Sequence, residues 1–68
     1  MNPDAFNMSI RKFLKMVGVR SQHEIEQAVA KAIESGRIKG NERLAAKMTL
    51  TVNGVDIAVD FDGEISLE

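Results

Sequence analysis

The strongest constraint on the fold is an Asn53-Gly54 pair that lies between two segments of alternating apolar and polar residues. Asn-Gly favours a two-residue hairpin turn, because both residues of that turn adopt positive φ. A period of two residues is typical of a β-strand with one apolar and one polar face. The C-terminal third is therefore predicted to form a β-hairpin.

A two-residue turn at Asn53-Gly54 also predicts how the two strands pair. On the apolar face it places Val52 opposite Val55, Leu50 opposite Ile57 and Met48 opposite Val59. On the polar face it places Thr51 opposite Asp56 and Lys47 opposite Asp60. The turn and the alternation agree, so we expect this register.

A second turn is expected at Asp62-Gly63, before a third strand over residues 64–67. A strict two-residue turn there would put Ile65 on the polar face, so we expect a bulge or a longer loop. Upstream, residues 36–47 are expected to form a loop with at most a very short edge strand around Ile38. Leu44 is expected to reach the core from this loop.

The N-terminal half predicts two helices. In the first, Asn2 is a suitable N-cap, Pro3 fits the first helical position, and Gly18 is placed for a left-handed C-terminal cap. In the second, Ser21 and Glu24 have the spacing of a capping box. The apolar residues recur at helical spacing, as Phe6, Ile10, Phe13, Leu14 and Val17, and then as Ile25, Ala28, Val29, Ala32 and Ile33.

Together these elements predict an α+β fold in one small domain over residues 1–68. Two N-terminal helices, the second ending at Ser35-Gly36, would pack on one face of a C-terminal two- or three-stranded antiparallel β-meander. The three phenylalanines are expected in the core.

The first helix has more apolar surface than this fold can cover. Ala5, Met8 and Met16 extend its apolar arc around Lys12, beyond half of the helix. A core in a chain of this length rarely supplies more than about 3–5 kcal/mol, so association would add stability. We therefore expect a non-enzymatic protein-interaction module with these four residues as its contact face, for a homodimer or another protein. Alternatively, they lie under the loop of residues 36–47, or Met8 is simply exposed.

The net charge of −1 hides an uneven distribution. Residues 1–47 carry all nine lysines and arginines and five of the ten acidic residues, whereas residues 48–68 carry only the other five acids. The two halves could neutralise each other, as Lys47 and Asp60 would. The alternative function is nucleic-acid binding by the basic residues, although no Tyr or Trp is present to stack on bases. These residues are Arg11, Lys12, Lys15, Arg20, Arg37, Lys39 and Arg43.

Catalytic and metal chemistry has few residues to use. Cysteine is absent, and the one histidine, His23, is predicted on the side of the second helix away from its apolar stripe. Asp60-x-Asp62-Gly63 resembles part of a calcium loop, but Ala58 stands at the first ligand position, so an acidic turn is expected. We expect no enzyme, cofactor or metal site. No apolar run is long enough for a membrane span, and Asp4 and other polar residues stand where a signal peptide would have its apolar stretch, so no export is expected.

Eight segments share a further likeness: Phe6–Lys15, Gly18-Val19, Ser21-Gln22, Glu24–Glu26, Ala28-Val29, Gly36, Ile38–Gly40 and Met48–Thr51. Together they resemble a family of short bacterial proteins known only as a domain of unknown function. Its members often have a proline after the residue that matches Leu44, whereas Ala45 follows here. The resemblance implies a small, free-standing cytoplasmic protein of bacteria. It implies no activity, so no functional residue is carried over.

Overall fold

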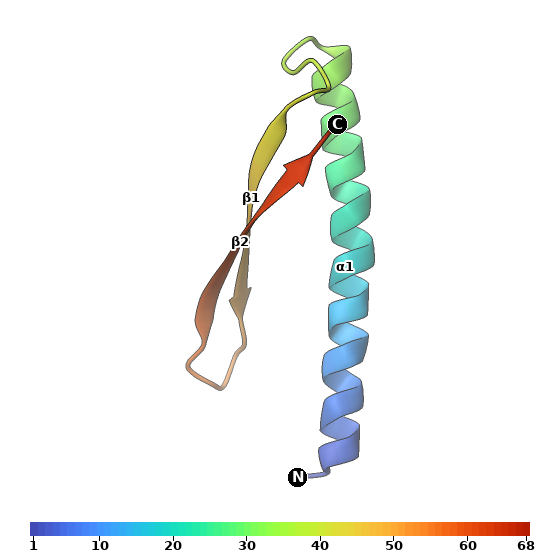
Figure 1. The fold of residues 1–68 in the computed structure, drawn as a ribbon. Coiled ribbons are helices and arrows are strands. Elements are labelled where there is room, and N and C mark those ends of the chain that lie inside the picture. The colour runs from blue at the N-terminus through green and yellow to red at the C-terminus, as the bar shows by residue number, and fades with distance from the viewer. The chain divides into compact units, whose positions relative to one another are not determined.

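A computed structural model describes every residue from Met1 to Glu68. Its elements in chain order are helix α1 (Pro3–Glu34), strand β1 (Arg43–Thr51) and strand β2 (Ala58–Ser66) (Figure 1). The chain divides into two compact units, Met1–Ser35 with the helix and Gly36–Glu68 with both strands. The α+β class is confirmed, with one helix in place of the two predicted.

α1 begins where the first helix was predicted to begin and ends where the second was predicted to end. At the start, Oδ1 of Asn2 accepts hydrogen bonds from the backbone N–H groups of Asp4 (3.0 Å) and Ala5 (3.1 Å), and Pro3 is the first helical residue. At the end, the backbone N–H of Ser35 donates to the carbonyl of Lys31, and Gly36 follows with φ +79°. These contacts satisfy backbone groups that a helix end otherwise leaves free.

The predicted break between two helices at Gly18 is wrong. α1 is continuous through Gly18 and Ser21, and Gly18 does not adopt the positive φ that a left-handed cap requires. One glycine inside a helix costs about 1 kcal/mol. Two additional helix ends would instead leave several backbone N–H and C=O groups without helical partners. Continuing the helix is therefore the less costly solution, and the Ser21–Glu24 capping-box spacing lies inside it.

The predicted hairpin is confirmed, but its register differs from the prediction by two residues. β1 and β2 pair antiparallel, with Leu50 opposite Val59 and Met48 opposite Phe61. Residues 52–57 form the connection, in place of a two-residue turn at Asn53-Gly54. Gly54 has φ +93° but Asn53 does not have positive φ, so the expected turn type is absent.

Side-chain size explains the observed register. On the apolar face it pairs Leu44 with Ile65, Ala46 with Gly63, Met48 with Phe61, and Leu50 with Val59. The register of a two-residue turn would instead place Leu44 opposite Gly63 and Glu42 opposite Ile65. The observed pairing matches large residues with large ones, which favours cross-strand packing. A shift of two residues keeps each side chain on its predicted face.

The predicted turn at Asp62-Gly63 and the third strand are wrong. β2 continues from Ala58 to Ser66, with Gly63 opposite Ala46 in the middle of the pairing. The apolar alternation runs through Phe61, Gly63 and Ile65 without a break, so a turn is not needed to keep Ile65 on the apolar face. Leu44 likewise lies in β1 and not in a loop, whereas Ile38 lies outside both strands.

No residue of the chain is buried. The three phenylalanines, which were predicted in the core, are all exposed: Phe6, Phe13 and Phe61. Every apolar side chain of the two units is therefore at least partly exposed. α1 contains no segment that is both long enough and apolar enough to cross a membrane.

Candidate interaction surface

The four predicted contact residues, Ala5, Met8, Lys12 and Met16, lie on the N-terminal half of α1 and are all exposed. Their spacing of three and four residues places them within about 80° of one another around the helix. Met8 is 71% exposed and Met16 is 40% exposed. We call these four residues the methionine face. It is an apolar strip with one lysine in its middle.

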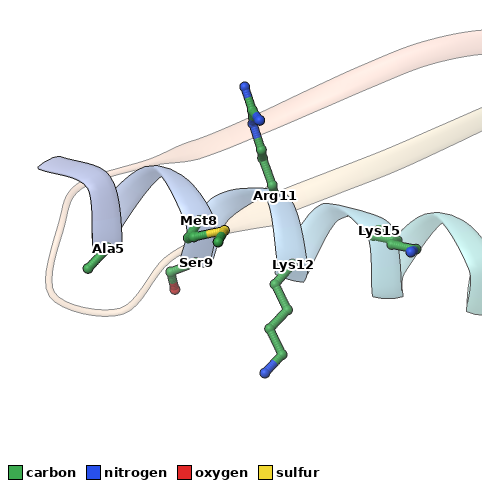
Figure 2. A pocket seen from close by; sticks show the side chains of 6 residues that line it. All are labelled: Ala5, Met8, Ser9, Arg11, Lys12 and Lys15. Carbon is green, nitrogen blue, oxygen red and sulfur yellow. The ribbon is translucent and has the colours of Figure 1, made fainter.

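A shallow, open depression overlaps the methionine face. It is lined by Ala5, Met8, Ser9, Arg11, Lys12 and Lys15 (Figure 2). The side chains of Arg11 and Lys12 extend from the helix in opposite directions (Figure 2). The surface therefore combines apolar side chains with three positively charged ones. Such an open surface suits contact with another macromolecule better than enclosure of a small molecule.

The sequence prediction identified the two halves of a second apolar side of α1, but it missed that the halves are continuous. This side consists of the eight residues Phe6, Ile10, Phe13, Val17, Ser21, Ile25, Ala28 and Ala32, which we call the long stripe. The prediction assumed that a second helix and the sheet would cover its first half, yet Phe6 is 53% exposed. The helical spacing from Val17 to Ser21 to Ile25 could have revealed this continuity, but the capping-box spacing of Ser21 and Glu24 favours a helix start at that point.

The structure brings together three of the seven basic residues predicted for nucleic-acid binding. Arg11, Lys12 and Lys15 all line the depression (Figure 2). Arg20 lies further along α1, and the remaining three belong to the other unit: Arg37, Lys39 and Arg43. In the hairpin, β1 places Lys47 opposite Asp62 of β2, and not opposite Asp60. The basic and acidic residues of the hairpin thus share its polar face.

The loop before β1 is organised around one carboxylate. The side chain of Glu42 accepts hydrogen bonds from the backbone N–H groups of Lys39 (2.8 Å), Gly40 (2.9 Å) and Asn41 (3.1 Å). These bonds lower the pKa of Glu42, and the bond from Lys39 is the largest cause. Gly40, with φ +106°, permits the backbone conformation that brings these amides together. The loop amides are thus already paired with an anion of the same chain.

Other candidate chemical groups are dispersed. His23 is exposed on α1. Asp60 and Asp62 lie in β2 and not in the expected acidic turn, and Oδ1 of Asp60 accepts a hydrogen bond of 2.7 Å from the Thr49 hydroxyl. No group of three or more histidine or acidic side chains is placed to hold a metal ion. The exposed faces of the elements are therefore the features on which a function can be built.

Comparison with known proteins gives one match. A family model described as a family of unknown function (DUF6494) matches residues 1–68. The resemblance inferred from the sequence, to a domain of unknown function, is thereby confirmed over the whole chain. No curated protein and no solved structure matches the chain.

Proposed function

We propose that this chain, which belongs to the DUF6494 family, is a non-enzymatic protein-interaction module that associates with itself through α1. The observation that carries the proposal is that no residue is buried, although 44% of the residues are hydrophobic. Burial of apolar surface is the main driving force of folding. An isolated helix and an isolated two-stranded hairpin are both marginal in water. Association supplies the missing burial.

The methionine face is the proposed contact on α1. Met8 and Met16 have flexible, unbranched side chains that adapt to irregular partner surfaces. The positively charged side chains of Arg11, Lys12 and Lys15 favour a partner with acidic side chains. A second copy of α1 has such side chains in its C-terminal half, namely Glu24, Glu26 and Glu34. Self-association therefore satisfies both the apolar and the charged parts of this surface.

The first test is the molar mass in solution, measured by light scattering at several protein concentrations. Refractive index must report the concentration, because the chain contains neither Trp nor Tyr. We expect a mass that is a multiple of the 7.5 kDa chain mass. A mass of 7.5 kDa at the highest concentration would contradict self-association.

A double substitution tests the methionine face itself. Met8→Glu with Met16→Glu is expected to lower the molar mass while circular dichroism still shows a helix, because two charges would enter the apolar contact. The matched control is Gln22→Glu with Gln27→Glu, which adds the same two charges in the C-terminal half of α1, outside the methionine face. The control should keep the wild-type mass. An unchanged mass in the methionine variant would remove this face from the contact.

Nucleic-acid binding is the second candidate function, because Arg11, Lys12 and Lys15 lie together around the depression. Binding through these residues would weaken steeply as the salt concentration rises, since each phosphate contact releases counterions. The test is retention on heparin and on mixed DNA and RNA at low salt. Replacing the three residues with glutamine should abolish retention. Absence of retention by the wild-type chain would exclude this function.

A further inference from the structure

We propose that α1 has a second contact, in which two copies of the chain pair antiparallel along the long stripe, about a twofold axis at the level of Val19. The stripe lies on the other side of α1 from the methionine face, so this contact adds to the one proposed above and does not depend on it. Its occupant is a second copy of the chain. Four features of α1 support this pairing: the spacing of the stripe, the sizes of its side chains, the distribution of charge and the small residues near the axis.

The spacing of the long stripe is symmetrical. Its successive residues are separated by four, three, four, four, four, three and four positions, which read the same from either end. The centre of this pattern is Val19. The mean step of about 3.7 residues is close to the 3.6 residues per turn of an α-helix, so the stripe remains on one side of α1 for about 39 Å. Reversing one copy therefore brings every position of the stripe onto another position of the stripe.

The sizes of the paired side chains favour the antiparallel arrangement. Rotation about Val19 pairs large residues of the first half with smaller residues of the second half: Phe6 with Ala32, Ile10 with Ala28, Phe13 with Ile25, and Val17 with Ser21. A parallel pair would instead set each residue against its own copy. Phe6 and Phe13 would then crowd one end, and Ala28 and Ala32 would leave a gap at the other. Well-packed interfaces alternate large and small residues across facing positions.

The charges of α1 favour the same orientation. Its first half, up to Arg20, has a net charge of +3, and its second half, from Ser21, has a net charge of −2. This distribution is opposite to the one that the helix dipole favours within a single helix. In an antiparallel pair, the basic half of each copy lies beside the acidic half of the other, and the two dipoles are opposed. A parallel pair would bring like charges together.

Small residues near the axis allow the two helices to approach closely. Ser21 belongs to the stripe, and Gly18 lies beside it on the helix surface. A Cβ atom added to Gly18 would have no heavy atom within 4 Å in the single chain, so this position is open to a neighbouring helix. No residue of the stripe is buried, and Phe6 and Phe13 are about half exposed. Every residue of the stripe is thus at least partly accessible.

Engineered disulfides test the orientation directly, because the full chain contains no cysteine. Ile10→Cys and Ala28→Cys are produced separately, mixed, unfolded and refolded together, and oxidised with glutathione. Mass spectrometry then distinguishes linked pairs of the two variants from pairs of one variant. The antiparallel pair predicts that the mixed product exceeds the half that random pairing would give, and that neither variant alone links efficiently.

The matched control is Gln27→Cys, which lies off the stripe beside Ala28 and should not enrich the mixed product with Ile10→Cys. Efficient linking of each variant to itself would show a parallel pair and overturn the proposal. No mixed product would show that another element, such as residues 36–68 of the same chain, covers the stripe, and would also overturn it. Repeating the experiment with Met8→Glu and Met16→Glu separates the two contacts, because the mixed disulfide should persist there even if the methionine face fails its own test.

Discussion

The hairpin and α1 distribute their apolar side chains differently. In the hairpin, alternation places apolar residues on one face, such as Met48 opposite Phe61, and polar residues on the other, such as Lys47 opposite Asp62. α1 instead has apolar residues on two sides, the methionine face and the long stripe. The hairpin therefore has one apolar face for a partner to bury, whereas the helix has two. This difference makes α1 the element on which we place both proposed contacts.

The two regions also depend on different kinds of backbone contact. Each hydrogen bond inside α1 joins residues four positions apart, so the continuity of the helix depends on local residues such as Gly18. The hairpin joins residues that are distant in the sequence, such as Leu44 and Ile65. Its register therefore depends on how well whole strands match. A single residue should be decisive in the helix, whereas pairs of residues should be decisive in the hairpin.

The largest effect is expected from Gly18→Pro. In a continuous helix, proline removes a backbone hydrogen bond and clashes with the preceding turn, which costs about 3 kcal/mol or more. The free energy of unfolding is measured by urea denaturation followed by circular dichroism, at one fixed protein concentration. The same experiment on Gly18→Ala should show stabilisation by about 1 kcal/mol, because alanine favours the helix. Destabilisation by alanine would support a helix break at Gly18 with positive φ.

The sequence predicted the ends of α1 but not its continuity. Asn2, Pro3 and the Ser35-Gly36 pair act through their immediate neighbours, so their roles can be recognised from local sequence. Gly18 and Ser21 are compatible with a helix end, but they do not require one. The methionine face was located because it depends only on helical spacing within the first turns. The continuity of the long stripe was missed because the stripe extends across the predicted break at Gly18.

The faces of the hairpin were predictable, whereas its register was not. Alternation assigns each residue to a face, and a shift of two residues leaves this assignment unchanged. The turn preference of Asn53-Gly54 is local, and it competes with the packing of all the cross-strand pairs. The pairing of Leu44 with Ile65 outweighs it, which could be seen only by comparing complete strands. The same comparison would have shown that Gly63 continues β2.

A smaller effect is expected from the pair that distinguishes the two registers. Thr49 lies opposite Asp60 and donates a hydrogen bond of 2.7 Å to it, whereas the two-residue turn would place Lys47 there. A double-mutant cycle with Thr49→Val and Asp60→Asn should give a coupling energy of about 0.5–1 kcal/mol in urea unfolding. The corresponding cycle with Lys47→Gln and Asp60→Asn should give a smaller coupling energy. The opposite ranking would favour the shorter turn.

The smallest and most local effect is expected at Glu42. Acid should destabilise the loop before β1 and leave the stability of α1 unchanged. The pKa of Glu42 is lowered in the folded chain, so its ionised form is the one that the loop amides stabilise. This stabilisation is complete above the ordinary pKa of 4.5 and is lost as the pH falls through the lowered value. Hydrogen-exchange protection of the Lys39, Gly40 and Asn41 amides should therefore decrease in acid.

Glu42→Gln should weaken this protection at neutral pH and remove its dependence on pH, while the amides of α1 keep their protection. Equal acid sensitivity in both proteins would show that another group controls the loop.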